Sequence, residues 1–217
     1  MKIFVFLHAD ESANRDEFQH HCLAVEGPRL LREFPQMRSL TMNLVIERPE
    51  VVQPRPYELL SPFRRCEVIV TALFEDEAAA RDFAARATFR ARLAEFVAVS
   101  GKTIFGEPRV TAAVGIMSFG RVQFHPDLPE SAIMRSWALH AELVREVLPH
   151  SIYYVQNFGL PNPGQPEQIA TGVAELAFPS ATVSSWSNSA NEKRLVHDLG
   201  HFVKSSCRHH AIAHVLR

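Results

Sequence analysis

The sequence predicts an α+β fold made of two similar halves, residues 1–110 and 111–217, each with a four-stranded antiparallel sheet and two helices on one face. Three observations predict it. Passages in corresponding places of the two halves align, both halves have the same order of apolar segments, and the strand-like segments are apolar on both alternating faces. A sheet that is apolar on both sides needs cover on both. We therefore expect helices on one face of each sheet and the other half's sheet on the second.

The clearest alignment places FPQMRSLTMNLV on LPHSIYYVQNFG without a gap. It pairs Asn43 with Asn157, and the same offset pairs Glu26 with His140. With small shifts, VIVTALF matches GVAELAF, and EFVAVSGKT matches HFVKSSCRH. Similarity at a fixed offset indicates one structural unit that is used twice. Each half then has the order strand, helix, strand, strand, helix, strand.

The first half begins with IFVFLHA, a short apolar run that is typical of a strand covered on both faces. Ser12 and Asn14 follow it as candidate helix N-caps. Phe18, Cys22 and Val25 then repeat at the spacing i, i+4 and i+7. This spacing predicts a helix with one buried stripe.

Two further strands of the first half are predicted over 37–46 and 66–74. The loop ERPEVVQPRPYELLSPFRR joins them, because its prolines cannot continue a strand. The second helix is predicted from DEAAARDFAARATFRARLAEF, which is rich in strong helix formers. The fourth strand follows this helix.

The second half repeats this order. Its first helix runs from about Pro129 to Leu148. Its middle strands, 151–160 and 170–178, are joined by the proline-rich loop LPNPGQPEQ. The later helix is predicted from apolar residues that share one face: Leu195, Leu199 and Phe202.

The passages WALHAEL, YYVQN and GVAELAF, in this order, resemble the EthD family within the dimeric α+β barrel superfamily. The resemblance covers the whole chain as two tandem copies and is closer in the second copy. It implies two ferredoxin-like repeats whose four-stranded sheets pack as one intrachain dimeric α+β barrel. Related barrels include cofactorless monooxygenases, polyketide cyclases, lactone isomerases and haem enzymes. The fold therefore leaves the reaction open.

The resemblance places the family's helix histidine on His140, with Glu142 where a proline is usual. The first copy keeps the proline as Pro28 but has Glu26 in place of the histidine. Imidazole suits proton transfer because its ordinary pKa of about 6.5 is close to working pH. We predict that His140 is the catalytic acid or base, and that the first copy lost or altered this chemistry. The alternative is a structural histidine bound to a backbone carbonyl or water.

Three more residues are predicted to belong to the site. If Phe178 points toward the helices, strand alternation sends Glu175 to the barrel interior, where a carboxylate needs a partner. Glu175 is therefore a catalytic candidate beside His140, or else one member of an internal hydrogen-bonded pair. Tyr154 and Asn157 are candidate substrate-binding groups. Their alternatives are a core aromatic residue with a polar tip and an asparagine that organises a turn.

Composition and spacing argue against several other classes of protein. The chain has 217 residues, 47% of them hydrophobic, and a net charge of −1, which is typical of a globular protein without a nucleic-acid or acidic-membrane partner. Cys22, Cys66 and Cys207 form neither a disulfide framework nor a zinc motif, and no run reaches the ~18 apolar residues of a membrane span. His197 and His201 have chelating spacing but lack a third ligand. We expect a cytoplasmic protein without a resident metal or cofactor.

Two classes of function follow. One is a cofactor-independent enzyme, of isomerase, cyclase or monooxygenase type, that acts on a small apolar or aromatic organic compound by proton transfer. The other is a non-catalytic carrier or accessory protein of a degradation or biosynthetic pathway that binds the same kind of compound. Haem held by His140 is a third alternative. Both a single barrel and a homodimer of barrels fit the sequence.

Overall fold

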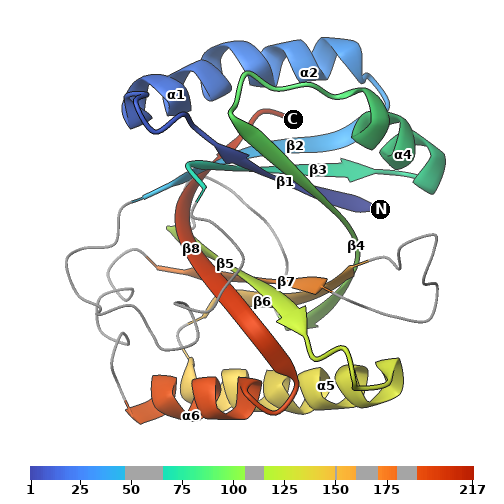
Figure 1. Cartoon of the computed structure of the whole chain (residues 1–217), viewed down its shortest axis with the longest axis vertical. Helices are drawn as coiled ribbons and strands as arrows, with labels where there is room; N and C mark the ends of the chain where they lie inside the picture. The colour runs from blue at the N-terminus through green and yellow to red at the C-terminus, as the bar shows by residue number, and fades with distance from the viewer. Residues whose placement is uncertain (47–65, 106–114, 150, 160–170, 180–189) are drawn as a thin grey trace.

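The computed structural model describes residues 1–46, 66–105, 115–149, 151–159, 171–179 and 190–217. Its strands form one closed barrel, with one group of helices above the barrel and another below it (Figure 1). No helix in these ranges is long and apolar enough to cross a membrane. Both proline-rich loops lie outside the described residues.

The described elements of the first half are β1 (Lys2–His8), α1 (Arg15–His21), the π-helical segment η1 (Cys22–Glu26), α2 (Gly27–Glu33), β2 (Met37–Val45), β3 (Val68–Phe74), α4 (Glu77–Arg86) and β4 (Leu93–Phe105). Those of the second half are β5 (Ile116–Phe124), α5 (Glu130–Val147), β6 (Tyr153–Gly159), β7 (Thr171–Phe178), α6 (Ala190–Leu199) and β8 (Val203–Val215). The predicted order of strands and helices is confirmed in both halves.

The helix starts follow from local capping chemistry. The Asn14 Oδ1 atom accepts hydrogen bonds from the backbone N–H groups of Asp16 and Glu17, at 2.9 and 3.2 Å. These bonds satisfy two of the donors that the first turn of a helix leaves open. Asn14 is therefore the N-cap of α1, as the sequence predicts. Pro129 occupies the N-cap position of α5, one residue before its predicted place inside the helix.

The second helix of the first half is shorter than the sequence predicts. Helix α4 ends at Arg86, where Ala87 turns to an extended conformation with ψ of 126°. The passage LAEF, predicted as the end of this helix, instead opens β4 and pairs with β1. Helix propensity is worth only tenths of a kcal/mol per residue, so a ladder of hydrogen bonds to an existing strand outweighs it.

The predicted fold, in which two ferredoxin-like repeats pack their four-stranded sheets as one intrachain dimeric α+β barrel, is wrong. All eight strands belong to one closed barrel in the order β1-β3-β2-β8-β5-β7-β6-β4, and every neighbouring pair is antiparallel. Strand β4 pairs with β1 along its first part and with β6 along its second. Strand β8 likewise pairs with β5 and then with β2.

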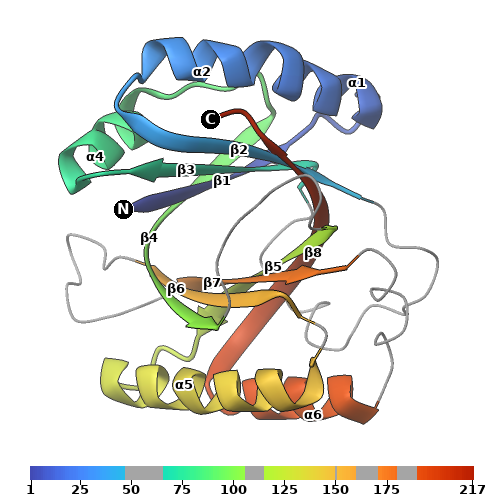
Figure 2. The same cartoon turned by 180° about the vertical axis from the view of Figure 1, so that it is seen from behind.

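The physical reason is the length of these two strands. Each has 13 residues, so each extends past the strand of its own half and reaches the other half. Figure 2 shows both strands running from one helical layer to the other. A closed barrel leaves no unpaired strand edge, whereas two stacked sheets would leave four. The barrel is therefore held together by backbone hydrogen bonds as well as by side-chain packing.

The core has an inner part and two outer parts. The inner cluster fills the barrel and includes Phe4, Phe6, Phe119, Tyr153 and Val173. A second cluster packs α1, η1, α2 and α4 onto the outside of β1, β2 and β3. On the opposite side, α5 and α6 cover β5, β6, β7 and β8 through two smaller clusters. The candidate site lies in this second helical layer.

Candidate functional site

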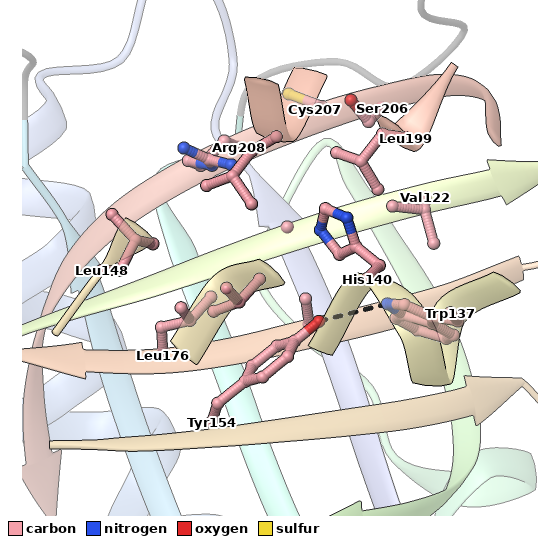
Figure 3. Close-up of a pocket in the computed structure, with 14 residues that line it drawn as sticks. Val122, Trp137, His140, Leu148, Tyr154, Leu176, Leu199, Ser206, Cys207 and Arg208 are labelled. Atoms are coloured by element: carbon pink, nitrogen blue, oxygen red, sulfur yellow. Dashed lines mark hydrogen bonds between the residues drawn. The ribbon is translucent and has the colours of Figure 1, made fainter. Parts of the chain in front are cut away.

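A cavity lies between helices α5 and α6 and the outer face of the strands beneath them (Figure 3). Its volume is about 40 Å³. The walls are mainly apolar, with a few polar groups, which is the usual composition of a small-molecule site. The lining residues that matter below are Gly120, Trp137, His140, Tyr154, Leu199 and Arg208.

His140 lies on the buried stripe of α5, and its side chain is directed into the cavity. The residue is only 5% exposed. Its Nδ1 atom is 2.7 Å from Oδ2 of Asp198 on α6, and its ring meets the edge of Phe202 with centroids 5.9 Å apart. Because the carboxylate is the acceptor, Nδ1 carries the proton and Nε2 keeps its lone pair. No other hydrogen bond of the His140 ring is present among the described residues.

The surroundings of His140 lower the pKa of its imidazole. Burial is the main cause, since it disfavours the charged form, and the positive charge of Arg208 acts in the same direction. The hydrogen bond and the charge of Asp198 oppose this shift without cancelling it. The ring is therefore neutral near pH 7. A neutral imidazole with one oriented N–H can accept a proton at its other nitrogen.

Tyr154 lies beside His140 in the cavity wall, as part of a small hydrogen-bonded network. Its hydroxyl oxygen accepts hydrogen bonds from Nε1 of Trp137 at 3.2 Å and from Nε2 of Gln156 at 3.0 Å. Nε2 of Gln156 also donates to the backbone oxygen of Trp137 at 2.6 Å. Burial raises the pKa of Tyr154 to about 12, despite opposing hydrogen bonds and the Arg208 charge. The phenol therefore stays protonated and can donate its own hydrogen.

Two features of the strands make the cavity possible. Gly120 on β5 and Ala174 on β7 face it with little or no side chain, and a Cβ atom at Gly120 would meet only the Cβ of Ala174, at 3.5 Å. Arg208 on β8 lines the same cavity and brings a positive charge to it. A larger residue at position 120 would thus enter the cavity without striking the backbone.

The structure does not bring the four predicted site residues together. His140 and Tyr154 line the cavity outside the barrel, whereas Glu175 and Asn157 lie inside the barrel. Glu175 lies on the interior face, as strand alternation predicts. Nδ2 of Asn157 donates to Oε1 of Glu175 at 2.7 Å and to the backbone oxygen of Val173 at 2.9 Å. Lys2 forms an ion pair with the same carboxylate. Glu175 thus belongs to an internal pair, separated from His140 by the sheet.

Glu26, the residue aligned with His140, lies in the opposite helical layer at the end of η1. Its carboxylate accepts hydrogen bonds from Nε and Nη2 of Arg29, at 3.0 and 2.6 Å, and from the backbone N–H of Arg90 at 3.3 Å. Burial alone would raise the pKa of Glu26, but these partners bring it below its ordinary value. Glu26 is therefore an ionised member of a closed ion-pair cluster.

Sequence reasoning missed three residues of the cavity site. Asp198, Gln156 and Arg208 are far from His140 in sequence, and each reaches it or its neighbours only through the packing of α6, β6 and β8. Asp198 directly follows His197, which was considered as a metal ligand because of its spacing to His201, whereas Asp198 itself was not considered. The only local signal for Asp198 is its place on the helix face of Leu195 and Leu199, where a charged residue is unusual.

The residues at hand do not suit a metal or haem. His197 and His201 face each other with ring centroids 5.2 Å apart, but no group of three potential metal ligands occurs among the described residues. His140 has the tautomer that an axial haem ligand needs. However, the cavity of about 40 Å³ that His140 faces is smaller than a porphyrin. The site fits a small organic molecule better.

Comparisons with known proteins agree with the fold and leave the family open. No protein-family model matches the sequence, and a search of curated proteins found no match. Several solved structures are similar to it. An anthrone oxidase-like protein has a TM-score of 0.63 at 10% identity, with 99% of this chain and 92% of that chain covered.

Two candidate monooxygenases are similar as well. The one from Fusobacterium nucleatum has a TM-score of 0.55 at 6% identity, and the match covers 100% of this chain and 91% of that chain. The one from Lactobacillus acidophilus has a TM-score of 0.50 at 9% identity and covers 99% and 94%. Identities this low show a likeness of fold alone. Nothing in the likeness supports the EthD family or a tandem repeat.

Proposed function

We propose that the chain binds a small, largely apolar organic compound in the cavity beside His140 and transfers a proton from it without a cofactor. The observation that carries this proposal is the environment of His140. A buried, neutral imidazole is oriented at Nδ1 by Asp198 and presents Nε2 to a mainly apolar cavity. Proton abstraction requires a base that is unprotonated at the working pH and oriented toward the proton that it takes.

The charges around the cavity suit the product of such a step. When Nε2 takes a proton from a weakly acidic C–H or O–H group, the substrate is left with negative charge. Arg208 supplies a fixed positive charge, and the hydroxyl of Tyr154 is held by Trp137 and Gln156 at the cavity wall. Fixed charges and dipoles of this kind stabilise an anion in a site that excludes water.

The names of the structural neighbours suggest a reaction to test. Anthrone is a three-ring ketone with an acidic CH₂ group. With O₂ it yields anthraquinone and water: the CH₂ carbon loses two hydrogens and gains one oxygen atom, and the second oxygen atom leaves as water. His140 would remove the first proton, and O₂ would then oxidise the resulting carbanion. Anthrone is larger than the cavity, so its entry requires a wall residue such as Leu199 to move.

The proposal is tested by O₂ uptake and anthraquinone absorbance with purified protein and anthrone, together with calorimetric binding of phenol as a smaller probe. We expect turnover that falls about 10²–10⁴-fold in His140→Ala, the usual effect of losing a general base. His197→Ala, on the same pair of helices but outside the cavity, is the matched control. Gly120→Val should abolish phenol binding by filling the cavity.

A carrier function is the second candidate, and one observation favours it. The bond between His140 and Asp198 joins α5 to α6, so it has a structural use whether or not chemistry occurs. If phenol binds, Gly120→Val prevents binding and neither anthrone nor O₂ is consumed, the carrier is supported and catalysis on this substrate class is rejected. If phenol does not bind, both functions are rejected.

A further inference from the structure

A second cavity adjoins the one at His140. Its volume is about 70 Å³, and residues of α6 and β8 line it together with Gly200. Leu199 and Ser206 line both cavities. The side chain of Leu199 thus lies at the boundary between the two cavities.

The two cavities differ in chemistry. The inner one contains His140, Tyr154 and Arg208, which can bind an acidic or anionic head group. The outer one is bounded by Val196, Leu199, Gly200 and Val203, with two serines on the strand side. The hydroxyl of Ser205 is already engaged with Oε1 of Gln123 at 3.1 Å. The outer cavity therefore suits an apolar group.

We infer that the ligand is an elongated molecule whose acidic head lies at His140 and whose aliphatic tail passes Leu199 into the outer cavity. This inference rests on the proposed function, because it assumes that the inner cavity binds the head group. Leu199 then determines specificity by limiting the length and width of the tail. The chemistry of the two cavities supports this, since polar side chains that suit an acidic group line the inner cavity and mainly apolar ones line the outer cavity.

The test compares phenol with 4-ethylphenol, 4-butylphenol and 4-hexylphenol. Binding is followed by fluorescence of Trp137, which lines the inner cavity, in a Trp186→Phe background that removes the other tryptophan. Burial of each methylene should tighten binding about fourfold, until the outer cavity is full. Leu199→Ala should strengthen the binding of 4-butylphenol more than that of phenol.

Val196→Phe isolates the outer cavity, because Val196 lines only that cavity. We expect it to leave phenol affinity within about twofold and to remove the gain from the alkyl chain. Val25→Phe is the matched control and should keep the gain, because Val25 lies in the opposite helical layer and is exposed, contrary to the buried position that its spacing predicts.

The outcomes separate the inference from the proposed function. Failure of phenol itself to bind would reject the proposed head-group site. Binding of phenol with no gain from the chain, or a gain that persists in Val196→Phe, would overturn the inference and leave the head-group site standing.

Discussion

The two helical layers contrast most sharply at the paired positions 26 and 140. In the layer of α1, η1 and α2, Glu26 is fixed by Arg29 and by the backbone of Arg90. The neighbouring space is filled, because a Cβ atom on Gly27 would lie only 2.3 Å from Cδ1 of Leu216. In the layer of α5 and α6, His140 is neutral and adjoins a cavity. The carboxylate of Glu26 thus has all its contacts within the protein, whereas the imidazole of His140 adjoins space that a ligand could occupy.

The barrel interior also contains two clusters that differ, a neutral one around Asn43 and a charged one around Asn157. Nδ2 of Asn43 donates to the backbone oxygen of Ile69 at 2.8 Å and to the hydroxyl of Thr71 at 3.0 Å. Asn157 makes the equivalent pair of bonds, with Glu175 in the place of Thr71. The second cluster needs Lys2 to balance its charge, and the first does not. The carboxylate of Glu175 thus ties this cluster to Lys2 on β1.

The largest expected effect concerns the dependence of one half on the other. We propose 1–110 and 111–217 as the two structural units of the chain, and we expect 1–110 expressed alone to aggregate or self-associate. Without β6 and β8, the second part of β4 and the outer edge of β2 lose their hydrogen-bonding partners, and the inner core is exposed. Size-exclusion chromatography and thermal unfolding check this against the full chain. A monomeric fragment with a cooperative unfolding transition would show that each half is self-sufficient.

The second prediction separates the two helical layers by their roles. Glu26→Gln should cost about 1.5–3 kcal/mol of unfolding free energy, because Arg29 and the Arg90 N–H lose a charged acceptor, and should leave anthrone turnover within about twofold. His140→Gln should reduce turnover about 10²–10⁴-fold while costing about 1 kcal/mol, since the amide can still donate to Asp198. Urea unfolding and steady-state kinetics on both variants measure this. Loss of turnover in Glu26→Gln, with loss of stability alone in His140→Gln, would instead place catalysis in the layer of α1, η1 and α2.

The third prediction concerns the barrel interior. Lys2→Met should cost about 2–3 kcal/mol, because it leaves the Glu175 carboxylate buried without its cation. The cost stays below that of a fully buried pair because the Lys2 side chain is 19% exposed. Thr71→Val, the counterpart in the first cluster, should cost only about 0.5–1.5 kcal/mol for one lost hydrogen bond.

A double variant provides the control for this third comparison. Lys2→Met combined with Glu175→Gln removes both charges and should recover most of the stability that Lys2→Met loses. Equal losses in the single and the double variant would show that the ion pair contributes little, and that packing of the lysine stem dominates.

The smallest expected effect is the contribution of His140 to the pH dependence of the unfolding free energy. Its pKa in the folded protein lies below the unfolded value of about 6.5, so the folded state binds fewer protons between these two values. The resulting stability is fully present above about pH 6.5 and is lost as the pH falls through the folded pKa. His140→Gln should remove this part of the pH dependence of unfolding.

Asp198→Asn sharpens the same prediction. Asp198 raises the pKa of His140 against burial and Arg208, so its neutralisation should lower that pKa further. NMR titration of the His140 ring should show the midpoint moving to lower pH, with His201→Gln as the control on the same side of the molecule. A midpoint that moves upward would mean that the Asp198 contact does not stabilise the protonated ring.

Part of the site was predictable because its signals are local. His140 stands out in WALHAEL as a polar residue on an apolar helical stripe, and strand alternation places Glu175 inside the barrel. Asp198 and Arg208 carry no such signal, because their relation to His140 depends on how α6 and β8 pack. For the same reason the sequence grouped His140 with Glu175, although a sheet separates them.

Local patterns in the sequence predicted the order of strands and helices, Asn14 as one of two N-cap candidates, and the interior position of Glu175. These depend on periodicity and turn chemistry, which act over a few residues. Only the tertiary structure decided that β4 and β8 join all eight strands into one barrel, and that His140 meets Asp198 beside a cavity. Both results depend on hydrogen bonds between residues far apart in the chain, and no local pattern specifies them.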